Sequence, residues 1–412
     1  MRNFTRRDFI RLLAIAAGGA LLPTSLAHAQ ETDGLCTAFS PSLAVEIADM
    51  FSENCIQNRP SAGNPIPLMD NSGNQIGWSV DYTLGGQPHG YILLDTTVNG
   101  LISRYSEYPG TKNLYDTAVS SHKTALQSIN NSPAIVKMSP LDFGAFDEPS
   151  HSSYSRDGSV TPLSSSPTSW ENLMIDMSQL FGNPYTVVGA DDLGDYRFLT
   201  ERQIEKHTGK YACGVTALFT IAGLTQFGNR FLIDTTSEYT ADWDAYDKLW
   251  TSTATVNDGS SNGIIYGSTK YEMIGIGFTT YCLTQQSYVQ DNSGKYNPTL
   301  SDYKTSVANK KHSVFSANIL TTNGSKSGHI MAVSGWRTLS GSGSTINGLV
   351  VYDGWSDMVF LNTSFSGYTS TYGTFSRKSS SNSCCLAGHS SLISRRCDMD
   401  SADFAGWRRN PQ

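Results

Sequence analysis

The chain has 412 residues and a formal net charge of −7, and only 16% of its residues are charged. Residues 1–29 hold four arginines against one aspartate, so the remainder carries −10, which argues against nucleic acid as a partner. The length allows two or three domains, and abundant Ser, Thr, Gly and Tyr suit an extracellular, β-rich protein.

The first 29 residues predict an export signal. A twin-arginine motif, Thr-Arg-Arg-Asp-Phe-Ile-Arg, stands at 5–11, and an apolar run follows at 12–22. Small residues at 27–29 suit a cleavage site, so we expect the mature chain to begin at Gln30. Retention as an anchor is the alternative, but the run is too short and interrupted to span a membrane well. We therefore expect a secreted or cell-envelope protein with no stable membrane insertion after signal removal.

Residues 30–145 are expected to form a small α+β domain. The segment from Ser42 to Cys55 has the apolar spacing of a helix. Short strand-like runs with turn residues between them follow at 66–70, 75–84, 90–95 and 100–105. The pattern predicts one helix packed on an antiparallel sheet.

A polar segment at 146–169 is predicted to be a linker. Ser, Thr and Pro fill most of 159–167, and such a composition buries too little apolar surface to order itself. Residues 170–375 then form a second, larger domain. Beyond it, 376–412 is a basic, Ser-rich tail with poor periodicity, and no function is assigned to it.

Seven cysteines leave at least one unpaired in an exported protein. Cys36 and Cys55 are near enough in sequence to form one bridge, and three more cysteines lie in the tail. Cys213 and Cys282 remain. An unpaired thiol is either a nucleophile or a buried, inert core residue.

Cys213 begins an apolar stretch with helical spacing, for which Gly228 is a plausible end. The unpaired N–H groups and the dipole at a helix start lower a thiol pKa, and a thiolate in a cleft is a nucleophile. Gly214 would let a substrate backbone approach closely. The alternative is a core helix that happens to begin with Cys-Gly.

His329 is the candidate base, because Gly-His opens an apolar strand over 328–336. A structural histidine is the alternative, and His207 is a rival because it stands six residues before Cys213. An acyl-transfer site also needs hydrogen-bond donors for the oxyanion. The main-chain N–H of Cys213 is one candidate and the side chain of Gln203 is another, with a solvated glutamine as its alternative.

Asp353 is the candidate orienting group, since it ends the apolar strand that starts at residue 349. Such a carboxylate can fix the tautomer of an imidazole and stabilise its cation. A Ser/Gly turn at 340–344 separates this strand from that of His329. A hairpin centred on Gly341 would place His329 opposite Asp353. The alternative is a turn-forming Asp-Gly.

In order and spacing, these residues resemble the papain-like bacterial cysteine peptidases of the bacteriocin-leader peptidase-like and streptopain groups. The resemblance covers roughly 200–360. Its matches are Gln203, residues 213–217 (Cys-Gly-Val-Thr-Ala), Gly328-His329 and Asp353. Asp353-Gly354-Trp355 is similar to the Asn-Ser-Trp of papain-like enzymes, which implies that Trp355 shields the His–Asp pair. In papain the Gln stands six residues before the Cys, where this chain has His207.

The resemblance implies an α+β, papain-like fold for 170–375, with the Cys-bearing helix packed on an antiparallel sheet. It implies an exported cysteine peptidase that cleaves a protein or peptide substrate through Cys213, His329 and Asp353, with Gln203 at the oxyanion, and that uses no cofactor or metal. It also implies that 30–145 is a prosegment-like domain of a zymogen, although a permanent binding domain is the alternative.

Two other functions fit the same residues. One is a catalytically inactive papain-like protein that binds ligands at the cell surface. The other is a cell-wall amidase, endopeptidase or acyl transferase that uses the same triad on a different bond. Nothing in the sequence indicates an oligomeric state.

Overall fold

The computed structural model describes residues 39–378, apart from the segments 99, 121–132, 140, 156–158, 164–184, 195–197, 225–231, 236–237, 242, 262, 285–289, 321–325, 342–343, 356–357 and 364–367. The predicted signal peptide and nearly all of the predicted tail lie outside the described residues. Within the described ranges, no helix is long and apolar enough to cross a membrane.

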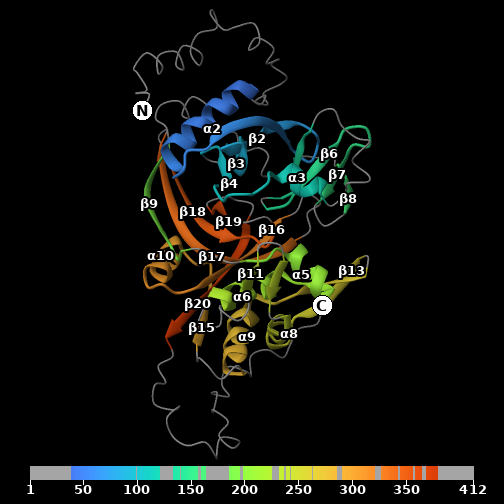
Figure 1. Ribbon diagram of the computed structural model, residues 1–412, viewed down its shortest axis with the longest axis vertical. Helices are drawn as coiled ribbons and strands as arrows, with labels where there is room; N and C mark the ends of the chain where they lie inside the picture. The colour runs from blue at the N-terminus through green and yellow to red at the C-terminus, as the bar shows by residue number, and fades with distance from the viewer. Residues whose placement is uncertain are drawn as a thin grey trace, which may run out of the picture. The chain divides into compact units, whose positions relative to one another are not determined.

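The described chain is a mixed α and β structure (Figure 1). Its helices are α2 (Pro41–Cys55), α3 (Leu114–Val119), α5 (Glu201–Thr208), α6 (Cys213–Leu224), α8 (Trp243–Ser252), α9 (Tyr271–Thr284) and α10 (Leu300–Ala308). The strands of the main sheet are β1 (Ser61–Met69), β2 (Gln75–Leu84), β3 (Gln87–Asp95), β4 (Ile102–Ser106), β5 (Ile135–Lys137), β6 (Phe143–Asp147), β7 (Ser152–Ser155), β8 (Val160–Pro162), β9 (Thr186–Asp192), β15 (Gln290–Tyr296), β16 (Ser313–Leu320), β17 (Lys326–Gly341), β18 (Ser344–Tyr352), β19 (Met358–Asn362) and β20 (Tyr368–Lys378). Two small sheets are formed by β10 (Lys210–Tyr211), β13 (Val256–Ser261) and β14 (Ile264–Ser268), and by β11 (Leu232–Thr235) with β12 (Glu238–Ala241).

One sheet runs through both of the domains that the sequence predicts. Its strand order is β15-β20-β16-β17-β18-β19-β4-β3-β2-β1-β5-β6-β7-β8, with β9 paired to β17. The two predicted domains meet where β19 pairs antiparallel with β4, Phe360 opposite Tyr105 and Leu361 opposite Arg104. Accordingly, the described residues up to Arg377 belong to one compact unit.

The prediction of a linker at 146–169 is partly wrong. Residues within 146–169 form β7 and β8, which extend the sheet from β6. Ser152, Ser153 and Ser155 are buried there, so their polar composition did not prevent order. Here the described residues 39–163 are called the N-terminal region, and the described residues 185–378 the C-terminal region.

The N-terminal region begins with the helix that the sequence predicts. Ser40 caps α2 by accepting a hydrogen bond from the Leu43 N–H, and Pro41 occupies the first turn, where its missing N–H costs nothing. The buried residues Ala44, Ala48 and Phe51 follow at helical spacing. The helix packs against β1 and β2, which pair antiparallel.

The core beneath α2 includes side chains from both regions. In one buried cluster, Ala44, Ala48 and Phe51 of α2 join Leu339 and further residues of the β17–β19 meander. Phe360 stacks on Tyr105 and Phe51 meets the same ring edge-on, with ring centroids 4.9 Å away in each case. The sheet and the hydrophobic core are therefore both continuous between the regions.

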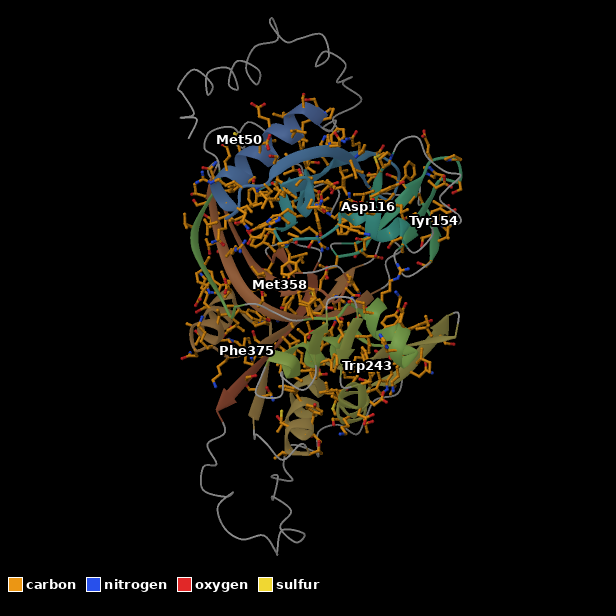
Figure 2. The ribbon with its side chains drawn as sticks, viewed as in Figure 1. Met50, Asp116, Tyr154, Trp243, Met358 and Phe375 are labelled. Atoms are coloured by element: carbon orange, nitrogen blue, oxygen red, sulfur yellow. The ribbon has the colours of Figure 1, made fainter. Side chains whose placement is uncertain are left out.

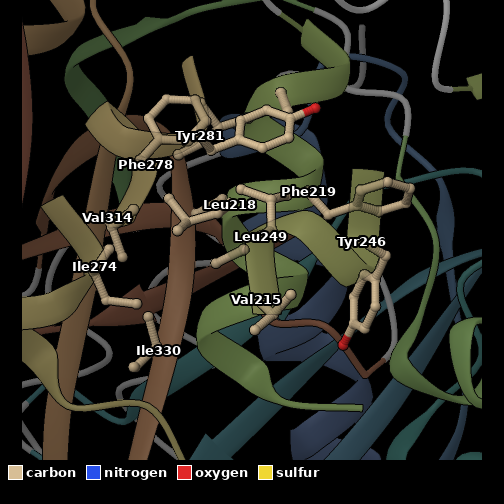
Figure 3. Close-up of a cluster of buried hydrophobic side chains, with 14 of the residues drawn as sticks. Val215, Leu218, Phe219, Tyr246, Leu249, Ile274, Phe278, Tyr281, Val314 and Ile330 are labelled. Carbon is tan, nitrogen blue, oxygen red and sulfur yellow. The ribbon is translucent and has the colours of Figure 1, made fainter. Parts of the chain in front are cut away.

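A second core surrounds α6 in the C-terminal region. Val215, Leu218 and Phe219 of α6 are at most 2% exposed. Figure 3 shows them among side chains of α8, α9, β16 and β17, which include Tyr246, Leu249, Ile274, Phe278, Val314 and Ile330. The helix that begins with Cys213 packs on β17 of the antiparallel sheet and ends at Leu224; Gly228 lies outside the described residues.

Cys55 is a free, buried thiol and not half of a disulfide. Its Sγ donates a hydrogen bond to the main-chain oxygen of Tyr185 at 3.2 Å, and burial raises its pKa to about 12. Cys36, the partner that the spacing suggested, lies outside the described residues.

Candidate active site

Cys213 is the first residue of α6, where neighbouring helices hold the turn in place. The N–H of Ala212 donates a hydrogen bond to the Tyr246 hydroxyl of α8 at 3.0 Å. Gly214 is required for packing: a Cβ there would lie 2.8 Å from Cδ1 of Ile274 and 3.1 Å from Cδ1 of Ile330. The glycine lets α6 approach β17 and α9 closely, whereas the sequence suggested a role toward substrate.

The pKa of Cys213 moves opposite to the direction that a helix start predicts. Burial, and next the negative charge of Glu201, raise the pKa to about 12, while main-chain N–H groups of Ile330, Gly214 and Cys213 lower it. The thiol therefore stays protonated at neutral pH and needs a base to become a nucleophile. Because the N–H of Ile330 is directed at the sulfur, Cys213 lies beside the strand segment that carries His329.

The strands of His329 and Asp353 form the predicted antiparallel hairpin in a shifted register. Gly341 pairs with Ser344 instead of standing at the centre of the turn, and a bulge interrupts the ladder between Val333 and Gly335. The ladder ends at Ala332 and Tyr352, so His329 and Asp353 are not paired directly across it. The predicted register was wrong because a run of Ser and Gly residues does not fix which of them closes the hairpin.

His329 and Asp353 are nevertheless in contact. Nε2 of the buried His329 lies 2.8 Å from the main-chain carbonyl oxygen of Asp353. A carbonyl oxygen only accepts, so Nε2 donates, and the neutral ring then carries its lone pair on Nδ1. The tautomer is thus fixed by the backbone of Asp353, whereas the sequence assigned that task to its carboxylate.

Trp355 covers this contact, as the resemblance implies. Its ring stacks on the imidazole of His329, with centroids 3.7 Å apart and planes 23° apart. The Trp355 N–H donates to Oδ1 of Asp353 at 2.9 Å. Gly354, between the two, has a φ of 78°, a left-handed conformation that favours glycine and turns the chain back over the histidine.

The carboxylate of Asp353 forms an ion pair that the sequence did not suggest. Its Oδ2 lies 2.9 Å from Nη2 of Arg104 in β4, and both side chains are 2% exposed. The guanidinium also lies near the rings of Tyr91 and Phe143. Arg104 belongs to the N-terminal region, so both regions contribute to the environment of the candidate site.

Glu201 is a second buried carboxylate near the thiol. It is 7% exposed and begins α5. Its N–H donates to the Gly354 oxygen at 2.8 Å, and its Oε2 accepts a hydrogen bond from Nε1 of Trp355 at 2.8 Å. The same Glu201 charge raises the pKa of Cys213.

Gln203 and His207 are placed differently from the sequence interpretation. Oε1 of Gln203 accepts hydrogen bonds from the N–H and hydroxyl of Thr200, which completes a capping box at the start of α5. This reassigns Gln203 from an oxyanion donor to a helix cap. The exposed His207 stacks on Trp243, which is labelled in Figure 2, with centroids 4.5 Å apart.

Sequence reasoning missed Arg104 and Glu201. Arg104 lies 249 residues before its partner in a strand of another predicted domain, and no local pattern reveals such a pairing. Glu201 had a usable signal: Thr-x-x-Gln at 200–203 is a capping-box pattern, which assigns Gln203 to the cap and places Glu201 at the first helical position.

No protein-family model matches the chain, and no curated protein matches it. A solved structure with partial similarity is that of the active wild-type interpain A cysteine protease of Prevotella intermedia. The TM-score is 0.29 and the sequence identity 10%, with 46% of this chain and 95% of that chain covered. At this level of likeness the geometry of the site carries the functional interpretation.

Proposed function

We propose that this protein is a cysteine peptidase in which Cys213 is the nucleophile, His329 the base and Asp353 the orienting residue. The observation that carries the proposal is the placement of the three residues. The sulfur of Cys213 receives the N–H of Ile330, the neighbour of His329, and Nε2 of His329 contacts the Asp353 carbonyl oxygen. A thiol, an imidazole with a fixed tautomer and a buried orienting residue are the parts of an acyl-transfer site.

The chemistry follows from the tautomer. With Nε2 donating to Asp353, Nδ1 of His329 accepts the Cys213 proton as the sulfur attacks a peptide carbonyl carbon. The C–N bond then breaks, and the imidazolium returns the proton to the leaving amine. Water attacks the resulting thioester with His329 again as base, which releases the carboxylic acid and restores the thiol. Main-chain N–H groups of Cys213 and Gly214 are our candidates for donors to the oxyanion.

A thiol-directed irreversible peptide inhibitor tests this proposal. We expect stoichiometric labelling that is lost in Cys213→Ala and in His329→Ala and retained in Cys282→Ser. Cys282 is the matched control because it is fully buried and burial likewise raises its pKa to about 12. Labelling that persists in Cys213→Ala, or that requires Cys282, would refute the assignment.

An inactive binding protein with the same fold is the second candidate, and the raised pKa of Cys213 favours it. Glu201 places a negative charge beside a half-buried thiol, which opposes thiolate formation. This alternative expects no hydrolysis of any peptide library and ligand binding that survives Cys213→Ala. Hydrolysis of a cell-wall peptide instead of a protein would retain the mechanism and change only the substrate.

Export and processing complete the proposal. We propose that the twin-arginine segment directs export and that Gln30 begins the mature chain. The double variant Arg6→Lys/Arg7→Lys would block export, and N-terminal sequencing of the exported protein would verify the mature start. The residues that follow could be released as a propeptide of a zymogen or retained as a permanent part. The pairing of β4 with β19 favours retention.

A further inference from the structure

We infer that the N-terminal region is a permanent part of the catalytic site, in which Arg104 is a positioning residue that holds Asp353 and, through it, His329. The catalytic half of this inference rests on the proposed function. Its structural half, the retention of the N-terminal region, stands independently of any activity.

The first argument is electrostatic. The Asp353 carboxylate is 2% exposed, and a buried carboxylate is stable as an anion only when a cation or hydrogen-bond donors compensate it. Arg104 supplies the cation at 2.9 Å, and the Trp355 N–H supplies a donor at 2.9 Å. Loss of Arg104 removes this cation from a buried carboxylate, which favours either uptake of a proton by Asp353 or its movement toward water.

The second argument is geometric. Asp353 holds His329 through its main-chain oxygen, so a movement of Asp353 displaces the imidazole as well. A displacement of about 1 Å at a catalytic group can cost on the order of a hundredfold in rate. Arg104 itself is fixed, because it lies in β4 between two neighbours of the sheet and near the rings of Tyr91 and Phe143.

The third argument is the interface around Arg104. A second ion pair crosses it, between Arg337 of β17 and Glu107, and Arg337 also donates to the Tyr105 hydroxyl at 2.7 Å. The Ser106 hydroxyl donates to the Met358 oxygen at 2.9 Å. Together with the shared core under α2, these contacts make the boundary resemble the interior of one domain and not a surface built for release.

Cleavage of the full chain between the regions tests retention. In this test, a protease recognition sequence is inserted between residues 164 and 169 of the wild type and of Cys213→Ala. Both proteins are then cut with that protease under native conditions. We expect the two fragments to co-elute in size-exclusion chromatography in both proteins, and the cut wild type to label with the thiol-directed inhibitor at the uncut rate. Release of the N-terminal fragment with labelling retained would overturn the inference.

The variants Arg104→Met and Arg104→Lys test the positioning role. Lys112→Met, at an exposed position, is the control. We expect kcat to fall about tenfold or more in Arg104→Met, with KM within about twofold, and to recover in part in Arg104→Lys. Displacement of His329 weakens its support of the thiolate, so the midpoint of Cys213 alkylation should shift to higher pH. An unchanged kcat and midpoint in folded Arg104→Met would contradict the role.

The titratable groups around the thiol are known, which makes the pH readout specific. They include Glu201 of α5, Tyr246 of α8, Tyr271 of α9 and His329 of β17. Lys112→Met removes a cation from the same region without touching the Asp353 pair, so it should leave the midpoint unchanged. Absence of any Cys213-dependent labelling in the wild type would refute the proposed function instead, while the co-elution of cut Cys213→Ala still decides retention.

Discussion

The imidazole ring of His329 lies on the indole of Trp355, with ring centroids 3.7 Å apart. The same indole donates from Nε1 to Oε2 of Glu201 at 2.8 Å, and the Trp355 N–H donates to Asp353. One residue therefore connects the start of α5, the candidate base and the candidate orienting residue. By covering the His329–Asp353 hydrogen bond, it also keeps that bond in a low-dielectric environment, where it is stronger.

Trp355→Ala should therefore lower kcat/KM by on the order of a hundredfold, because the imidazole loses the ring that holds its plane. Trp355→Phe keeps an aromatic ring and loses only the donor to Glu201, so we expect a smaller loss, about tenfold. Steady-state kinetics on a peptide substrate measure both, with thermal unfolding as a check on folding. Equal losses in the two variants would mean that the hydrogen bond to Glu201, and not the stacking, is the important contact.

Glu201→Gln should make Cys213 more reactive as a thiol. Because the Glu201 charge raises the pKa of Cys213, its removal lowers that pKa. At a pH well below the pKa, the thiolate fraction rises about tenfold for each unit by which the pKa falls, so alkylation at a fixed pH should accelerate. The measurement is the rate of Cys213 alkylation as a function of pH, and the midpoint of this curve should move to lower pH.

Glu205→Gln is the control for Glu201, since it removes a charge from the same helix without a hydrogen bond to Trp355. We expect no shift of the alkylation curve there. A shift to higher pH in Glu201→Gln would show that Glu201 stabilises the reactive form, for instance by supporting a protonated His329.

Gln203→Ala separates a helix cap from an oxyanion donor. The capping box predicts a loss of about 1 kcal/mol in the free energy of unfolding and little change in kcat. An oxyanion donor would instead cost a hundredfold or more in kcat. Thr200→Ala removes the other half of the box and should match Gln203→Ala in both measurements, which are denaturant unfolding and steady-state kinetics.

The local patterns of this chain were readable from its sequence. The helical spacing from 42 to 55 corresponds to α2, which buries one face, and the strand-like run from 75 to 84 corresponds to β2. The Cys-Gly at the helix start and the two apolar strands with His329 and Asp353 also follow from local signals. These predictions depend on periodicity and turn chemistry, which act over a few residues.

The rest depended on contacts that no local pattern encodes. The pairing of Arg104 with Asp353 spans 249 residues, and the register of the hairpin depends on where the Ser/Gly run between the strands closes. The pKa of Cys213 was expected to fall at a helix start, but burial among the side chains of other elements dominates. The linker was misjudged because β7 is ordered by pairing with β6 and β8 by pairing with β7, and not by their own composition.

The ion pair of Lys137 and Asp95 tests how far the N-terminal region is a folded core. Nζ of Lys137 lies 2.6 Å from Oδ2 of Asp95, and both side chains are at most 1% exposed. Lys137→Met leaves the Asp95 charge buried and should cost about 3–5 kcal/mol of unfolding free energy. Lys295→Met breaks the exposed pair with Asp302 and should cost at most about 1 kcal/mol.

Denaturant unfolding of both lysine variants, followed by inhibitor labelling, checks this prediction. If the two regions unfold together, Lys137→Met lowers a single transition that also abolishes labelling of Cys213. Two separate transitions, with labelling lost only in the second, would show instead that the N-terminal region unfolds alone.

Gly214→Ala should displace the start of α6. The added Cβ would meet Cδ1 of Ile274 at 2.8 Å and Cδ1 of Ile330 at 3.1 Å, so either the helix or its neighbours must move. Overpacking of this kind costs about 1–3 kcal/mol, and labelling of Cys213 should slow because its sulfur shifts from the N–H groups that stabilise the thiolate.

Ile274→Val and Ile330→Val supply a matched rescue, since valine lacks the Cδ1 atoms that an alanine at 214 would strike. Combining Gly214→Ala with both should recover part of the labelling rate, since the contact with Cβ of Thr269 at 3.0 Å remains. The two valine variants alone should cost only about 0.5–1.5 kcal/mol each. Recovery of stability without recovery of labelling would mean that the missing side chain at 214 serves an approaching substrate, as the sequence first suggested, and not the packing of α6 against β17.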